Sequence, residues 1–225
     1  MGSLYIVSTP IGNMKDITLR ALEILFKVQV ILAEDTRKTS QLLRVYKNDK
    51  EIPRLVSFYE ENESRRNPEV IEWLKSGLDV ALVSDAGTPL ISDPGFKLVR
   101  QCVEENIKIV PIPGASALLA GLTVAGLPTD KFIFLGFLPK KTGKKEKLLK
   151  KALGNKMTIV FYESPFRILK TLKTLDTFHP GMELKVVVGR ELTKKFEEVL
   201  RGTPEELIKG FGDKKIKGEL VVLVN

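Results

Sequence analysis

Short apolar runs alternate with segments of helical periodicity along almost the whole chain, and this alternation limits the fold more than any other feature. Strands that are separated by helices imply βαβ units, in which neighbouring strands pair in parallel. Helix starts are expected at Asp16, where a carboxylate can cap the first turn, and at Asp93-Pro94. The sequence therefore predicts an α/β fold with a mostly parallel sheet. The strand-like runs of the first half are residues 4–8, 28–33, 55–58, 80–83 and 107–112.

The second half repeats the alternation. Ser164-Pro165 is expected to open a helix, and Thr203 with Glu206 forms a capping-box pattern. A proline- and glycine-rich stretch, residues 111–114, lies near the middle of the chain. We therefore expect two α/β domains, residues 1–112 and 113–225. The strand-like runs of this half are residues 132–138, 157–162, 184–188 and 220–224.

The rare residue types exclude several classes of protein. The 225 residues contain one cysteine, Cys102, and one histidine, His179, so neither an intramolecular disulfide framework nor a Cys/His zinc site can form. Cys102 is expected in the core and His179 in a turn, and no metal is expected. No apolar run reaches the ~20 residues of a membrane span, and the N-terminus lacks the features of a signal peptide, so we expect a cytoplasmic protein without membrane contact.

Positive charge is concentrated in one segment. The chain carries a net charge of +8, and residues 138–156 contain eight lysines and only one glutamate. One interpretation is a solvated helix surface; the other is a cationic loop that contacts the phosphates of a nucleic acid, since Pro139, Gly143 and Gly154 interrupt the segment. The segment contains no aromatic residue, so base stacking within it is not expected.

Polar and glycine-rich loops follow three strands of the first half, at residues 9–13, 34–37 and 84–95. Ligands of open α/β sheets bind at the carboxyl ends of the strands, so these loops predict a binding crevice. Asp35 has an alternative role as a helix N-cap. No Walker A or G-x-G-x-x-G pattern is present, which argues against an ordinary mononucleotide or dinucleotide site.

Three further segments are candidates for the same crevice. Residues 113–117 lead into a helix of small residues, which permits either a flat ligand or close packing of the helix on the sheet. Residues 161–167 and 189–194 place carboxylates and guanidinium groups directly after strands. These two corners predict either local salt bridges or one shared cleft.

Taken together, six motifs resemble the tetrapyrrole methylase superfamily, and within it the enzymes that methylate ribosomal RNA. The resemblance implies a two-domain, class III methyltransferase fold, with each domain a mixed sheet flanked by helices and the cofactor cleft between the domains. It implies S-adenosylmethionine as cofactor, the 2′-hydroxyl of a cytidine ribose in the decoding region of the small-subunit (16S) ribosomal RNA as substrate, and a homodimer. The motifs are YIVSTPIGN (5–13), AEDTR (33–37), SDAGTPLISDPG (84–95), PIPGASA (111–117), FYESPFR (161–167) and GRELTK (189–194).

The resemblance also implies roles for individual residues. The cofactor would contact Pro10, Gly87, Thr88, Ile91, Ser116, Ala117, Tyr162, Gly218 and Glu219. Because a ribose hydroxyl is a weak nucleophile, a carboxylate is expected to take its proton, and we hypothesise that this is Asp35, Asp85 or Glu163. The RNA would be held by Arg37, Lys140, Lys141, Lys144, Lys145, Arg167, Arg190 and Lys194.

Two rival functions remain open, and one feature departs from the family. The rivals are a methyltransferase for a tetrapyrrole or corrinoid precursor and a basic RNA-binding module without catalysis. Many relatives extend beyond the position that matches Asn225; if that extension holds RNA, the lysine segment is expected to do so here.

Overall fold

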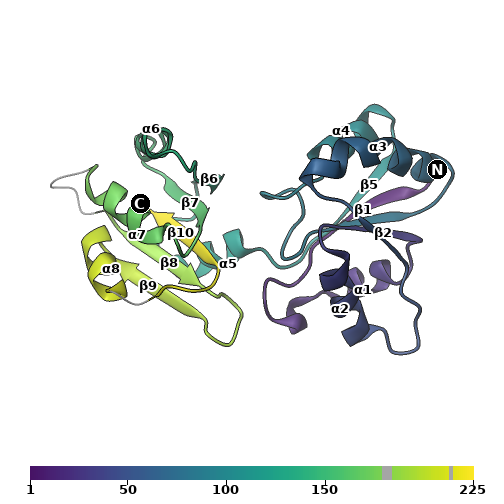
Figure 1. The fold of residues 1–225 in the computed structure, drawn as a ribbon, viewed down its shortest axis with the longest axis horizontal. Coiled ribbons are helices and arrows are strands. Elements are labelled where there is room, and N and C mark those ends of the chain that lie inside the picture. The colour runs from purple at the N-terminus through teal and green to yellow at the C-terminus, as the bar shows by residue number, and fades with distance from the viewer. Residues whose placement is uncertain (179–183, 213–214) are drawn as a thin grey trace. The chain divides into compact units, whose positions relative to one another are not determined.

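The protein, seen here as a computed structural model, is described over residues 1–178, 184–212 and 215–225. These residues form two compact units, Met1–Ser116 and Ala117–Asn225 (Figure 1). The predicted domain boundary lies after Ile112, whereas the boundary between the two units lies after Ser116. His179, expected in a turn, lies outside the described residues.

The first unit contains a five-stranded sheet in the order β3-β2-β4-β1-β5. All of its strand pairs are parallel, as the alternation of strands and helices predicts. β2 and β4 are buried along their whole length, which is typical of strands whose two faces are both covered by helices. The strands are β1 (Ser3–Val7), β2 (Val30–Ala33), β3 (Arg54–Ser57), β4 (Val80–Val83) and β5 (Lys108–Ile112).

Helices cover both faces of this sheet: α1 and α2 lie on one side, and α3 and α4 on the other (Figure 1). Cys102 of α4 is fully buried in the core, as expected. The helices are α1 (Leu19–Leu25), α2 (Thr36–Tyr46), α3 (Glu60–Lys75) and α4 (Phe96–Glu104), and a 3₁₀ turn, η1, covers Met14–Asp16.

Two predicted helix starts are wrong. The N-cap of α1 is Thr18, whose hydroxyl accepts a hydrogen bond from the Ala21 N–H, while Asp16 lies in η1. α4 begins at Phe96 rather than at Asp93-Pro94. The reason is the backbone before it, because Gly95 has a φ of +121° that no helix can contain.

The second unit contains a mixed five-stranded sheet in the order β6-β7-β10-β8-β9. β6 and β7 are parallel, and the other three pairings are antiparallel. β9 was not predicted from the sequence: it is a half-exposed edge strand without a clear apolar alternation. The strands are β6 (Phe132–Phe137), β7 (Thr158–Glu163), β8 (Val186–Arg190), β9 (Glu198–Gly202) and β10 (Leu220–Val224).

One face of the second sheet packs against α6, α7 and α8 around the main core of the unit, and α5 packs on the strands from the other side. A Cβ atom on Gly121 of α5 would lie 2.9 Å from Val221 Cγ1, so the small residues of this helix permit close packing on the sheet. The predicted capping box of α8 is present. The helices are α5 (Ala117–Ala125), α6 (Thr142–Leu153), α7 (Ile168–Asp176) and α8 (Pro204–Phe211).

The helix expected from Ser164-Pro165 begins later, at Ile168, because the carbonyl of Ser164 accepts hydrogen bonds from the Arg167 and Ile168 N–H groups in a preceding turn. The predicted fold class, an α/β protein with two sheets flanked by helices, is confirmed. The expectation of a mixed sheet in each domain holds only for the second unit, because every strand pair of the first sheet is parallel. Within the described part of the chain, no helix is both long and apolar enough to span a membrane.

Candidate active site

The polar loops of the first unit meet at the carboxyl edge of its parallel sheet. β2, β4, β1 and β5 are consecutive neighbours, so the segments that follow them emerge side by side. Because each loop follows a strand of the same parallel sheet, motifs that are distant in the chain, such as those of Ser8 and Thr88, 80 residues apart, reach the same edge.

Hydrogen bonds join the loop after β1 to the loop after β4. The backbones of Thr9 and Gly87 exchange two hydrogen bonds of 2.8 and 3.0 Å. Thr88 Oγ1 lies 3.0 Å from Ser8 Oγ and donates to the carbonyl of Ala115 at 3.1 Å, which connects the loop after β5. The structure therefore brings together four of the cofactor-binding candidates of this unit: Pro10, Gly87, Thr88 and Ser116.

The backbone of these loops requires small residues. Gly87 has a φ of +83°, and a Cβ atom there would approach Ile11 Cγ2 to 3.3 Å. A Cβ atom on Gly114 would lie 2.9 Å from Ser8 Cβ. Leu90 and Ser92 also have positive φ angles, 70° and 71°, although neither is a glycine. Strain of this kind is common where a loop is shaped for a ligand, and Ile91, another candidate, lies exposed between these two residues.

Asp35 caps α2, which is the alternative role that the sequence allowed for it. Its carboxylate accepts hydrogen bonds from the Arg37 N–H at 2.9 Å and from the Arg37 guanidinium at 2.7 and 3.0 Å. The hydrogen bonds from Arg37 hold the pKa of Asp35 well below its usual range. Asp35 is therefore a weak proton acceptor. The Arg37 side chain is 86% exposed.

Asp85 lies at the centre of a carboxylate cluster. Lys38 Nζ donates to its Oδ2 at 2.6 Å, and the Asp35 N–H donates to its Oδ1 at 3.0 Å. Glu34 and Asp93 complete the cluster. Burial and the neighbouring Asp85 raise the pKa of Glu34. Burial and the charge of Glu34 raise the pKa of Asp93 to about 6.

Sequence reasoning missed Glu34, Lys38 and Asp93. The signal for Glu34 was its position directly after the buried β2, and the signal for Asp93 was its place in the same loop as Asp85. Nothing local in the sequence pointed to Lys38, because its contact with Asp85 spans 47 residues of chain. In the described residues, no group of carboxylates, Cys and His is arranged to hold a metal ion.

The candidates of the second unit also share one edge of a sheet. β7 and β8 are each antiparallel to β10, so their carboxyl ends lie beside the start of β10. This edge brings together Tyr162 of β7, the corner that begins at Arg190, and Gly218-Glu219 before β10. Tyr162 is held by edge and tilted ring contacts with Phe134 and Phe137.

Gly218 and Glu219 are held by Glu191. Glu191 Oε1 accepts hydrogen bonds from the Glu219 N–H at 2.9 Å and from Lys194 Nζ at 3.0 Å, and Lys194 also pairs with the Glu219 carboxylate. Hydrogen bonding to the Glu219 N–H lowers the pKa of Glu191. A Cβ atom on Gly218 would lie 2.4 Å from Glu191 Cγ, so only glycine fits there. Arg190 pairs with Glu198 of β9.

Glu163, one of the three carboxylates expected as a possible base, is enclosed in the second unit. Its side chain is 0% exposed, and its oxygens accept hydrogen bonds from the Arg167 guanidinium and from Thr171 Oγ1 at 2.7 Å. A carboxylate enclosed in this way cannot reach a substrate hydroxyl. Arg167 in turn donates to the Leu138 carbonyl at 2.7 Å, which ties this corner to the end of β6.

The lysine segment is mostly helical. α6 covers Thr142–Leu153, so the expectation of a cationic loop holds only for the residues before it. Lys140, Lys141 and Lys144 are exposed. Lys145 is buried, and its Nζ donates to Thr171 Oγ1 at 3.1 Å. The expectation that Lys145 contacts RNA is wrong, because its position inside the unit excludes that role, and burial lowers its pKa.

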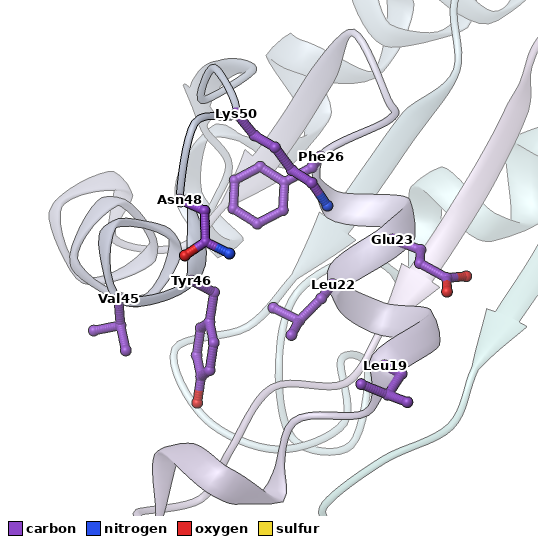
Figure 2. A pocket seen from close by; sticks show the side chains of 8 residues that line it. All are labelled: Leu19, Leu22, Glu23, Phe26, Val45, Tyr46, Asn48 and Lys50. Carbon is purple, nitrogen blue, oxygen red and sulfur yellow. The ribbon is translucent and has the colours of Figure 1, made fainter.

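A surface pocket of about 300 Å³ lies elsewhere in the first unit, between α1 and the end of α2 (Figure 2). Leu22 and Phe26 form its apolar side, and Lys50 lies over the Phe26 ring. None of the candidate residues lines this pocket. Its lining consists of Leu19, Leu22, Glu23, Phe26, Val45, Tyr46, Asn48 and Lys50.

The chain is similar over its length to known methyltransferases. A family model described as Tetrapyrrole (Corrin/Porphyrin) Methylases matches residues 3–208. A protein of Thermotoga maritima named Ribosomal RNA small subunit methyltransferase I is 46% identical over 225 residues, which are 100% of this chain and 99% of that protein. A protein of Synechocystis with the same name is 46% identical over 224 residues, covering 100% of this chain and 79% of its own.

Solved structures show the same fold at low sequence identity. The cobalt precorrin-4 methyltransferase CbiF has a TM-score of 0.72 at 20% identity, with 99% of this chain and 94% of that chain covered. A uroporphyrin-III C-methyl transferase from Thermus thermophilus, complexed with S-adenosyl homocysteine, has a TM-score of 0.65 at 18% identity, covering 99% of this chain and 97% of the other. The family model matches most of the chain and a relative is 46% identical over the whole of it, so the chain belongs to the tetrapyrrole methylase family and is a methyltransferase.

Proposed function

We propose that this protein transfers a methyl group from S-adenosylmethionine to the 2′-hydroxyl of a cytidine ribose in the decoding region of the small-subunit ribosomal RNA. The observation that carries the proposal is the 46% identity, across the whole of both chains, with a relative named for methylating small-subunit ribosomal RNA. The cytidine and its ribose oxygen are the finer part of the proposal, and their support is the resemblance that the six motifs carry.

The first unit offers surroundings that suit S-adenosylmethionine. The joined loops around Gly87, Thr88 and Ser116 present main chain and small side chains, against which a flat nucleoside can lie closely. The nearby carboxylates Glu34, Asp85 and Asp93 suit a positively charged sulfonium. We assign cofactor contacts to Pro10, Gly87, Thr88, Ile91, Ser116 and Ala117, and in the second unit to Tyr162, Gly218 and Glu219.

S-adenosylmethionine, when bound, supplies an electrophilic methyl group. The chain must then hold the ribose oxygen in line, ~3–3.5 Å from that carbon, and accept its proton. A general base works best when its pKa is near the working pH, and Asp93, with a pKa of about 6, meets this condition better than Asp35. We therefore propose that the base is one of the two carboxylates of the loop after β4, Asp85 or Asp93, rather than Asp35.

Exposed cations are assigned to the phosphates of the RNA. Lys140, Lys141 and Lys144 are exposed, and Arg37 is exposed although it pairs with Asp35. Arg167, Arg190 and Lys194 are less exposed and are engaged in ion pairs. The protein is expected to act as a homodimer in the cytoplasm. Light scattering at micromolar concentration tests the dimer.

The direct test is methylation of purified small subunits with a tritiated methyl donor, followed by nuclease mapping of the labelled nucleotide. We expect label in a cytidine of the decoding region, resistant to alkaline cleavage at its 3′ side because the 2′-oxygen is blocked. Label on a base or in another region would contradict the assignment of the ribose. Single-turnover rates of the Asp93→Asn, Asp85→Asn and Asp35→Asn variants at saturating cofactor then test the base.

The alternative is a methyltransferase for a tetrapyrrole precursor, which the family description and the solved structures with this fold favour. The two substrates differ in their response to salt. RNA binding releases counterions, so methylation of RNA should fall steeply between 50 and 200 mM salt, whereas turnover of a small tetrapyrrole should change little. A third possibility, an RNA-binding module without catalysis, would bind RNA but give no heat in a titration with S-adenosylmethionine.

A further inference from the structure

Exposed aromatic rings stand at the carboxyl edge of β6 and β7. Phe137, the last residue of β6, is 62% exposed, and Phe166, in the turn after β7, is 86% exposed. β6 and β7 are parallel, so both residues belong to the same edge of the sheet. Exposing two large apolar rings to water is unfavourable, and such surfaces commonly mark a binding site.

The strand ends that carry these rings are well fixed. The Phe137 ring lies 5.5 Å from the Tyr162 ring, which in turn lies 5.1 Å from that of Phe134. Arg167 forms an ion pair with Glu163 and donates a hydrogen bond to the Leu138 carbonyl, so it holds the turn that contains Phe166 against the end of β6. A ring on a fixed support loses little conformational entropy when a partner stacks on it.

Exposed lysines follow Phe137 closely in the chain. Lys140 and Lys141 follow Phe137 by three and four residues, and both are exposed. Aromatic side chains beside a cationic track are the combination by which proteins hold single-stranded nucleic acids: bases stack on the rings and phosphates pair with the cations. The lysine segment has no rings of its own, but the fold places Phe137 and Phe166 at its start.

We propose that Phe166 and Phe137 form a stacking platform for unpaired nucleobases of the RNA substrate, with Lys140 and Lys141 on the adjacent phosphates. This inference rests on the proposed function, because it names how that substrate is held. The occupant is single-stranded RNA, since the neighbouring charge is positive and a duplex offers no free base faces. The platform shares this edge of the second sheet with Tyr162 and Gly218, two of the proposed cofactor contacts.

The test measures binding of a fluorescently labelled single-stranded RNA by anisotropy at several salt concentrations. Phe166→Ala and Phe166→Leu should each weaken binding about tenfold, because the stacking of one base is removed, whereas Phe166→Trp should retain it. The slope of log affinity against log salt should stay unchanged in these variants. Lys140→Ala with Lys141→Ala should instead reduce that slope by about 0.7 for each phosphate that the protein no longer neutralises.

Phe96→Leu is the matched control, because Phe96 is an exposed ring of the first unit, 66% exposed, with no place in the platform. If Phe166→Leu binds RNA as well as the wild type, or loses equal affinity for a duplex of the same sequence, stacking is refuted. If Phe137→Leu and Phe166→Leu together leave the affinity unchanged, the platform as a whole is refuted. Failure of the wild type to methylate small subunits would instead refute the proposed function, so the two failures can be told apart.

Discussion

At the scale of single residues, Asp93 couples the candidate site to stability. Burial and the charge of Glu34 raise its pKa from 3.8 to about 6. A carboxyl group whose pKa is raised on folding stabilises the folded state below its unfolded pKa, and this contribution is lost as the pH rises through the folded pKa. The Asp93 carboxylate therefore destabilises the protein at neutral pH.

The Asp93→Asn variant should consequently be more stable than the wild type at pH 7.5, and the difference should disappear below pH 3.8, the unfolded value. Urea unfolding at a series of pH values measures this. The single-turnover methylation rate of the same variant, compared with that of Asp85→Asn, tells which of the two proposed carboxylates takes the proton: the variant of the base should lose most of its rate. If Asp93→Asn gains no stability at pH 7.5, the charged Asp93 carboxylate does not destabilise the folded protein and its pKa is not raised.

Gly87 provides a second residue-scale prediction. Its φ of +83° costs any other residue ~1–2 kcal/mol, so Gly87→Ala should lower the free energy of unfolding by about that amount and weaken cofactor binding. Gly77 is the matched control: its φ is +99°, and a Cβ atom there would meet nothing within 4 Å. Gly77→Ala should show the same loss of stability with unchanged affinity for S-adenosylhomocysteine in calorimetry. Equal losses of affinity in the two variants would show that Gly87 does not contact the cofactor.

At the scale of elements, Glu163 joins β7 to α7. Glu163→Gln leaves the Arg167 guanidinium and the nearby Lys145 without their buried counter-charge, which typically costs about 3–5 kcal/mol. Chemical denaturation should show this loss, while the methylation rate per folded molecule should stay within about tenfold of the wild type. Glu104→Gln, which breaks an exposed ion pair with Arg100, should change stability by less than about 1 kcal/mol. A folded Glu163→Gln protein without activity would restore Glu163 as the base.

Neighbouring lysines of α6 should behave in opposite ways. Lys144 is exposed, so Lys144→Ala should weaken RNA binding and leave thermal stability unchanged. Lys145 is buried against Thr171, so Lys145→Met should lower thermal stability and leave the salt dependence of RNA binding unchanged. Melting temperatures and anisotropy titrations of the two variants provide the comparison. A reduced salt slope in Lys145→Met would mean that this side chain does reach phosphate.

At the scale of the whole molecule, the two units have separate hydrophobic cores. The cofactor contacts proposed here come from both units, so a bound cofactor should stabilise both. At a hundredfold excess over its dissociation constant it should add about 2.7 kcal/mol to the free energy of unfolding. Hydrogen exchange with S-adenosylhomocysteine should slow in residues 84–95 and in residues 218–224. Protection in the first unit alone would refute the assignments to Tyr162, Gly218 and Glu219.

The alternation of strands and helices was readable from the sequence because it depends on local patterns. The strands 80–83 and 220–224 match β4 and β10 at both ends, since continuous apolar runs bounded by polar turns leave little choice. β9 and the start of α1 were not readable. An edge strand lacks a buried face, and both Asp16 and Thr18 are acceptable caps until the packing of Ala21 and Leu25 selects one.

The sequence by itself determined the family, the two-sheet architecture and the loops that carry the site, because the motifs follow directly on strands whose carboxyl ends must share an edge. Only the tertiary structure decided which charged side chains are accessible. Glu163 lies in one of the six motifs and Lys145 in the lysine segment, and the sequence made both candidates for the site, yet the packing of α6, β7 and α7 encloses them. Lys38 joins the candidate site because the fold brings it, from 47 positions away, to Asp85, and Asp93 joins it through the charge of Glu34 and its own burial. Burial and long-range charge arise from the whole fold, and no local pattern encodes them.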